Sequence, residues 1–213
     1  WSPDEFPAPT QLLGELDALG LKTTVIIDPG IKEDPGYWVY DEGMAHDYFV
    51  SNADGSVFVG EVWPGPSVFP DFTNPDTRSW WAGLISGLTD VGVEGVWIDM
   101  NEPTTFTGTF PLDTQFDGEG IPTTLVETRN LYASLMAQAT HLGLTQARPT
   151  ERPFVLTRAG FAGIQRYSAT WTGDAMSSWE HLAMGPAMLS NLGLSGAPFV
   201  GSDVGGFTGD PGS

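Results

Sequence analysis

Short apolar runs alternate with helical patterns along this chain, and most of the runs are apolar almost throughout. The five runs cover residues 23–27, 95–98, 154–157, 168–171 and 198–201. Unbroken apolar runs are typical of parallel strands that helices cover on both faces. Because strand and helix patterns alternate, the sequence predicts an α/β parallel sheet with right-handed crossovers, in either a doubly wound fold or a barrel.

Local signals indicate where the intervening helices begin and end. Gly20 follows leucines at helical spacing and has the residue type of a C-terminal cap. Asn74 and Pro75 suit the N-cap and the first position of a second helix. A third apolar stripe spans residues 131–142, and we expect that helix to stop at Gly143.

Charged side chains follow the apolar runs and favour the barrel. Asp28, Asp99, Arg158 and Asp203 come at or just beyond the ends of four runs, and Asp174 follows the fifth. In a TIM (β/α)8 barrel these positions converge on one mouth, where barrel enzymes place their chemistry. The chain also lacks a Gly-x-Gly-x-x-Gly or Gly-Lys-Ser/Thr loop, which would favour a nucleotide-binding sheet. It supplies only about five of the eight strands of a barrel.

The charge balance of the chain excludes several kinds of partner. There are 27 acidic and 8 basic side chains, a formal net charge of −19 at pH 7. Such a chain is too acidic to bind nucleic acid or an anionic membrane. No apolar run approaches the roughly 18 residues of a membrane span, and the sequence has neither a signal-peptide pattern nor an Asn-x-Ser/Thr acceptor. We expect a soluble protein, and these absences slightly favour the cytoplasm.

The residue types that usually bind metals or perform redox chemistry are scarce. The absence of cysteine excludes disulfides, thiolate metal sites and a thiol nucleophile. His46, His141 and His181 are too scattered for a metal triad and are more typical of surface or packing residues. The Asp99-x-Asn-Glu stretch faintly suggests Mg²⁺, but magnesium chemistry usually serves phosphate. We therefore expect no metal and no cofactor.

Two aspartates beside tryptophans are the strongest candidates for catalysis. Asp99 follows the run that contains Trp97, and Asp174 lies three residues after Trp171. An ordinary aspartate in such a place is usually a helix cap or a turn former. Two carboxylates at one barrel mouth can instead cleave a glycosidic bond, one as nucleophile and the other as general acid and base. Glu102 is assigned a supporting role.

Seven segments carry a resemblance to a known family. They are DPGIK at 28–32, VWPG at 62–65, FPDFTNP at 69–75, WIDMNEP at 97–103, RPFVLTRAGFAGIQRY at 152–167, WTGD at 171–174 and GSDVGGF at 201–207. In this order they resemble the catalytic barrel of glycoside hydrolase family 31, the retaining α-glucosidases and their relatives. The resemblance implies a retaining, exo-acting α-glucosidase that releases terminal non-reducing α-linked glucose from oligosaccharides through a covalent glycosyl-enzyme.

The same resemblance assigns roles to individual residues. It implies that Asp99 is the nucleophile and Asp174 the acid/base. The side chains implied to bind substrate are Asp28, Trp63, Trp97, Met100, Arg158, Trp171, Asp203 and Phe207. Because a nucleophile must be ionised, we expect the Arg158 guanidinium to lower the pKa of Asp99.

Relative to the family, residues 1–213 correspond to a partial catalytic barrel, about its third to seventh strands, with an elaborated loop region at 28–75. The resemblance implies that the missing strands, a substrate-binding histidine and the flanking β-domains belong to the same enzyme and are possible partners of this chain. We therefore expect little activity from the isolated chain. A carbohydrate-binding fragment or subunit without catalysis stays open as an alternative, as do α-xylosidase and transglucosidase activities.

Overall fold

A five-stranded parallel sheet forms the centre of the molecule. The computed structural model describes residues 1–210. The strands, in their order across the sheet, are β1 (Thr24–Ile27), β5 (Gly95–Ile98), β8 (Phe154–Thr157), β9 (Ala169–Trp171) and β10 (Val200–Gly201). Each pair of neighbours is parallel. All five strands fall within the apolar runs, and the prediction of a partial barrel is confirmed.

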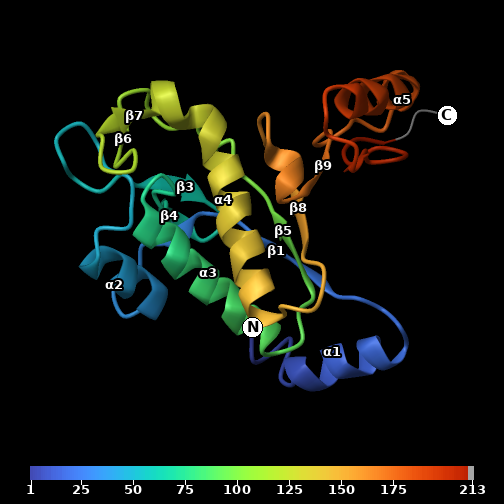
Figure 1. Cartoon of the computed structure of the whole chain (residues 1–213), viewed down its shortest axis with the longest axis horizontal. Coiled ribbons are helices and arrows are strands. Elements are labelled where there is room, and N and C mark those ends of the chain that lie inside the picture. The colour runs from blue at the N-terminus through green and yellow to red at the C-terminus, as the bar shows by residue number, and fades with distance from the viewer. Residues whose placement is uncertain (211–213) are drawn as a thin grey trace.

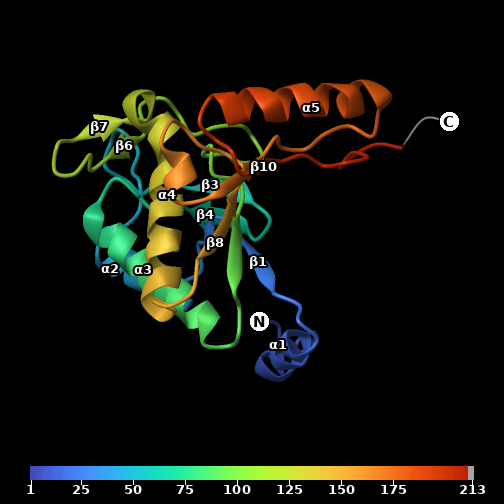
Figure 2. The same cartoon turned by 45° about the vertical axis from the view of Figure 1, so that its right-hand side comes forward.

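The helices lie around this sheet, and two of them form most of its cover. They are α1 (Pro9–Ala18), α2 (Trp38–Ala45), α3 (Pro75–Thr89), α4 (Leu125–Ala147) and α5 (Trp179–Leu194), with a 3-10 turn at Ile164–Arg166. Helices α3 and α4 run side by side along one face of the sheet, whereas α5 lies apart from both, beyond β9 and β10 (Figures 1 and 2). Within residues 1–210 we find no helix with the length and apolar character that a membrane span requires.

Two of the predicted helix ends are formed by the residues that signalled them. The Asn74 side chain accepts a hydrogen bond from the amide of Asp76 at 2.8 Å, and Pro75 occupies the first turn of α3. Gly20 adopts φ +78° just after α1, a conformation that suits glycine because it has no Cβ. Of the leucines at helical spacing in α1, only Leu13 is buried.

The predicted end of the third helix at Gly143 is wrong, because α4 continues to Ala147. Gly143 is buried where α4 crosses α3. A Cβ at this position would lie 2.5 Å from the carbonyl oxygen of Ala82 and 2.9 Å from the Cβ of Ile85. This glycine therefore permits close approach of two helices, a tertiary requirement that resembles a helix stop in the sequence.

The hydrophobic core fills the space between the sheet and the α3–α4 pair. Val96 and Ile98 of β5 are completely buried beneath these helices. Four aromatic rings form the centre of the core: Phe69, Phe72, Phe110 and Tyr132. Trp81 packs edge-on against Phe72 and donates its indole N–H to Thr140 at 2.9 Å, which satisfies its buried polar group.

The elaborated region at 28–75 contains regular structure. A small antiparallel sheet has the order β2 (Ile31–Lys32), β4 (Gly65–Val68) and β3 (Gly60–Val62), and α2 lies beside it. A second hairpin-like pair, β6 (Gln115–Phe116) and β7 (Thr123–Thr124), precedes α4. These additions follow the carboxyl ends of β1 and β5, so they surround the same edge of the main sheet.

We expect Gly143→Ala to lower the free energy of unfolding by about 1–3 kcal/mol, because the added methyl group would collide with the backbone of α3. Gly83 lies within α3 with open space around it, so Gly83→Ala should raise the same quantity by about 0.5–1 kcal/mol. Chemical denaturation followed by circular dichroism measures both. Equal effects of the two substitutions would contradict the close helix contact.

Candidate active site

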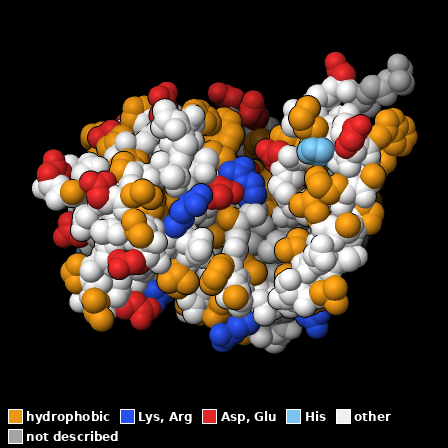
Figure 3. Space-filling view, turned by 90° about the horizontal axis from the view of Figure 1, so that it is seen from above, with side chains coloured by type: hydrophobic (Ala, Val, Ile, Leu, Met, Phe, Trp, Pro, Cys, Tyr) orange, Lys and Arg blue, Asp and Glu red, His pale blue; other side chains and the backbone are white. Residues whose placement is uncertain are grey.

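The polar residues that follow the strands lie at one edge of the sheet. Asp28, Asp99 and Arg158 come directly after β1, β5 and β8, and the strands pair with Ile27 opposite Ile98 and Ile98 opposite Thr157. Because these strands are parallel and in register, the three polar residues share one level. Viewed from above this edge, acidic and basic side chains meet near the middle of the face (Figure 3).

Arg158 connects two carboxylates. Its Nε and Nη2 donate to the two carboxylate oxygens of Glu102 at 2.7 and 2.9 Å, a bidentate arrangement. The same Nε lies 3.1 Å from Oδ1 of Asp99, but that oxygen accepts no hydrogen bond from the described part of the chain. Arg158 is therefore hydrogen-bonded to Glu102 and paired with Asp99 through charge alone. Its Nη2 also lies 2.9 Å from the sulfur of Met100.

The pKa values of these two carboxyl groups are displaced in opposite directions. Burial raises the pKa of Asp99, and the Met100 amide and Arg158 only partly oppose this effect. Burial also acts on Glu102, but the hydrogen bonds and charge of Arg158 outweigh it and lower the pKa of Glu102. Arg158 acts on the pKa of Asp99 in the expected direction, but burial outweighs it, so the pKa of Asp99 lies above its usual value.

Asp28 lies near Asp99 and Arg158 and has a carboxylate oxygen without a hydrogen-bond partner among the described residues. Its Oδ1 is buried and has no hydrogen-bond partner among residues 1–210. Burial, followed by the negative charge of Asp99, raises the pKa of Asp28 to about 6, although Arg158 opposes the shift. A buried carboxylate without a partner is costly unless a ligand supplies donors. The hydroxyl groups of a sugar are donors of this kind.

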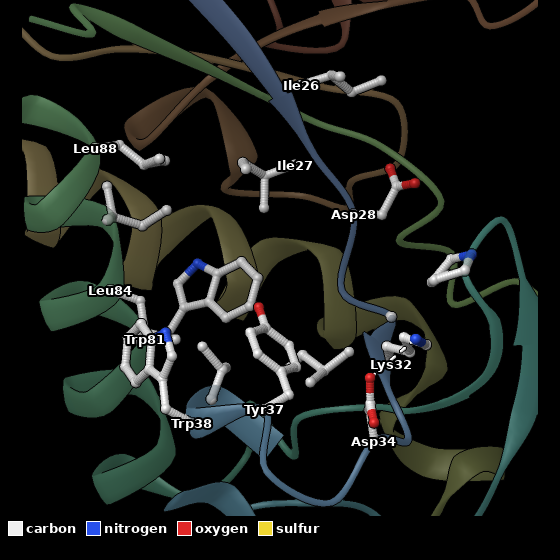
Figure 4. Close-up of a pocket in the computed structure, with 15 residues that line it drawn as sticks. Ile26, Ile27, Asp28, Lys32, Asp34, Tyr37, Trp38, Trp81, Leu84 and Leu88 are labelled. Carbon is white, nitrogen blue, oxygen red and sulfur yellow. Dashed lines mark hydrogen bonds and ion pairs between the residues drawn. The ribbon is translucent and has the colours of Figure 1, made fainter. Parts of the chain in front are cut away.

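A cavity lies behind Asp28. It measures about 640 Å³ and is bounded by β1, α2 and α3, with mostly apolar walls. Figure 4 shows that Trp81 and Leu84 face this space, whereas the Asp28 carboxylate points away from them. Asp28 itself lines the cavity, so the cavity adjoins the place where the charged side chains meet.

Asp174 and Asp203 follow β9 and β10 at the carboxyl edge of the sheet, near the start of α5. Asp174 is exposed on the loop that follows β9, and its negative charge contributes to the raised pKa of both Asp99 and Arg158. One carboxylate oxygen of Asp203 accepts from the amide of Ala175 at 3.4 Å. Asp174 and Asp203 also line a small hollow of about 90 Å³. The structure thus brings Asp174 within the electrostatic reach of Asp99.

The apolar residues assigned to the site are divided between two places. Trp97 and Trp171 pack edge to face, with their ring centroids 5.4 Å apart. Trp63 is 64% exposed and contacts Phe106 edge to face. Phe207 is also exposed, on the segment that pairs with the Asp174 loop. Among residues 1–210, no cluster of three or more His, Asp or Glu side chains could hold a metal ion.

The sequence gives little indication of two contacts near the candidate site residues, those of Phe106 and His181. Phe106 gave no signal, because its contact with Trp63 depends on the fold of the loop around β3. The sequence predicts a surface or packing role for His181, yet its ring accepts a hydrogen bond from the loop that carries Asp174. The only local signal for it was its position three residues after Ser178, which is typical of the first turn of a helix.

The family assignment rests on the whole chain. The model of the glycosyl hydrolases family 31 TIM-barrel domain matches residues 1–213. The chain belongs to glycoside hydrolase family 31. It is 50% identical over 206 residues to alpha-glucosidase 2 of Bacillus thermoamyloliquefaciens, a match that covers 96% of this chain and 26% of that protein.

Solved structures of the family have the same fold. The crystal structure of a glucosidase II alpha subunit superposes with a TM-score of 0.92 at 40% identity, covering 99% of this chain and 24% of that one. A family 31 alpha-glucosidase from Bacteroides thetaiotaomicron gives a TM-score of 0.82 at 43% identity, covering 99% and 34%. The chain therefore spans about a quarter to a third of the length of these relatives.

We expect Asp28→Asn to stabilise the protein at neutral pH. The fold favours the protonated form of Asp28, so its cost is absent below the usual pKa of 3.8 and grows as the pH rises through about 6. Asparagine removes this cost. The melting temperature of the variant should exceed that of the unsubstituted protein at about pH 7.5, and the difference should vanish near pH 3.5. A difference that is independent of pH would contradict the raised pKa.

Proposed function

We propose that this chain carries the catalytic centre of a retaining, exo-acting α-glucosidase that hydrolyses terminal non-reducing α-linked glucose. The observation that carries the proposal is the arrangement of Asp99 and Asp174, two carboxylates from different strand ends that share one electrostatic environment with Arg158. Retaining glycosidases use such a pair, separated by about 5–5.5 Å. The names of the family relatives support glucose as the sugar.

The first step forms a covalent intermediate. A lone pair of the Asp99 carboxylate attacks the anomeric carbon as the bond from that carbon to the leaving oxygen breaks. The leaving oxygen takes the proton of the Asp174 carboxyl group and departs as an alcohol. In the second step, water attacks the anomeric carbon and gives a proton to Asp174, and the bond to Asp99 breaks. Glucose leaves with its α configuration retained.

The contacts of Asp99 suit a nucleophile. Its Oδ1 is buried and accepts no hydrogen bond from the described residues. Arg158 lies 3.1 Å away and stabilises the ionised form, while Glu102 holds the guanidinium in that position through two hydrogen bonds. Asp99 is therefore a carboxylate made reactive by burial and kept charged by a neighbouring cation.

The remaining assigned residues suit recognition of a neutral sugar. Asp28 and Asp203 offer carboxylate oxygens to sugar hydroxyl groups. The apolar side chains offer faces and edges to the C–H surface of the ring: Trp63, Trp97, Met100, Trp171 and Phe207. We propose that residues 1–213 perform this role as the central part of a barrel in a longer enzyme, and that its remaining strands complete the pocket. A substrate of this site is an oligosaccharide or an aryl α-glucoside.

We expect Asp99→Ala in the full-length enzyme to lower kcat on 4-nitrophenyl α-glucoside by about 10⁴-fold or more, because no covalent intermediate can form. Glucose binding, measured by calorimetry, should change little. Asp113 is exposed on the loop before β6, and Asp113→Ala serves as the matched control with unchanged kcat. Residual turnover by Asp99→Ala near that of the control would mean that Asp99 is not the nucleophile.

The stereochemistry of the product tests the mechanism separately. Proton NMR should detect α-glucose first, followed by slow mutarotation to the β form. Initial release of β-glucose would refute the double displacement and leave the carboxylate pair as an inverting one. Faster turnover of an aryl α-xyloside than of the aryl α-glucoside would identify xylose as the preferred sugar and leave the proposed mechanism unchanged.

A further inference from the structure

The loop that carries Asp174 is held mainly by hydrogen bonds. Asp174 and Met176 are exposed, so little apolar burial fixes residues 174–178. The backbone of this loop pairs with the segment that follows β10: the amides of Phe207 and Thr208 donate to the carbonyl of Ala175 at 2.7 and 3.2 Å. The amide of Ser177 donates to the carbonyl of Thr208 at 2.8 Å.

A glycine allows this pairing to be close. At Gly206 a Cβ would lie 2.4 Å from the Cα of Ser177, and the backbone there has φ +94°. Only glycine suits both the conformation and the space. The two segments are therefore fixed against each other on one side of the loop.

His181 fixes the other side of the loop. The amide of Met176, two residues after Asp174, donates to Nδ1 of His181 at 2.9 Å. A backbone amide can only donate, so Nδ1 must present its lone pair and a neutral ring must carry its proton on Nε2. The histidine therefore acts as an acceptor for a loop amide next to the proposed acid.

The start of α5 holds the histidine in place. Ser178 is the N-cap of α5, and its Oγ accepts from the amide of His181 at 3.2 Å. His181 thus lies in the first turn of the helix, where its backbone is fixed by the cap and its ring reaches back to Met176. The ring also lines the small hollow that Asp174 and Asp203 share. Loop, cap and helix form one connected unit.

We propose that His181 is a positioning residue that holds the Asp174 loop in the geometry required for proton donation to the leaving group. The proposal rests on the function proposed above, in which Asp174 is the acid/base. It concerns only the hydrogen bond from the Met176 amide to Nδ1, and His181 itself exchanges no proton with substrate. A displaced acid loses catalysis because proton transfer requires hydrogen-bond distance to the leaving oxygen.

The test compares two substrates of the full-length enzyme that differ in their need for an acid. Maltose has a poor leaving group that requires protonation, whereas fluoride leaves α-glucosyl fluoride with little help. We expect His181→Ala to lower kcat/KM for maltose by about 10- to 100-fold and for α-glucosyl fluoride by less than about 3-fold. A loss of equal size on both substrates, or no loss on either, would overturn the proposal.

Two further substitutions separate the acceptor from the bulk of the side chain. Asparagine can place its Oδ1 near the position of Nδ1, whereas the longer glutamine places its oxygen beyond it. We expect His181→Asn to keep maltose turnover within about 3-fold of the unsubstituted enzyme and His181→Gln to behave like His181→Ala. If His181→Ala fails to fold, this pair decides the question, and equal maltose turnover by the two variants would count against the proposal.

Two controls distinguish the failure of this proposal from other effects. Asn74→Ala removes the cap of α3, far from the loop, and should lower the melting temperature without a difference between the two substrates. Asp174→Ala should show the same substrate difference as His181→Ala, but larger. If Asp174→Ala lowers turnover of both substrates equally, Asp174 is not the acid, and the positioning role of His181 is refuted as well. If Asp174→Ala shows the substrate difference and His181→Ala does not, only the positioning role fails.

Discussion

The parallel register of β1, β5 and β8 is the constraint on which the site depends. Because each apolar strand ends at the same level, the next residue of each chain segment emerges at one edge, and these residues are Asp28, Asp99 and Arg158. A slip of one residue would turn each side chain to the other face of the sheet. The burial of β5 beneath α3 and α4 prevents this slip, so the packing of the core determines the geometry of the charged groups above it.

The scarcity of cations gives Arg158 a central place in the electrostatics of this edge. The whole chain has 8 basic side chains against 27 acidic ones, and this guanidinium faces at least two carboxylates. Arg158 donates its hydrogen bonds to Glu102 and interacts with Asp99 through charge alone. In this arrangement Oδ1 of Asp99, the proposed nucleophile, accepts no hydrogen bond among the described residues, while both carboxylate oxygens of Glu102 accept one from Arg158.

The sequence predicted most of what local and apolar patterns determine. The bounds of β5 and β8 match their apolar runs, and Asn74 caps its helix, because burial and capping act over a few residues. It failed at Gly143 because the close contact of two helices has no local pattern. It also missed the net direction of the Asp99 pKa shift, since the depth of burial, which outweighs the charge of Arg158, cannot be known before the chain is folded. The contact of His181 was missed because its partner is a backbone amide, which every residue type except proline offers.

The two carboxylates proposed for catalysis lie on parts of the chain that differ in local stability. Asp99 follows a strand that is buried under α3 and α4, whereas Asp174 lies on an exposed loop beside α5, a helix with no buried residue. Local opening requires less free energy where few apolar contacts must be broken. In residues 1–213 alone, the region around α5 would therefore exchange its amide hydrogens and become accessible to proteases while β5 stays protected. Thermal inactivation would then begin with displacement of Asp174, the proposed proton donor, in a molecule whose core is still folded.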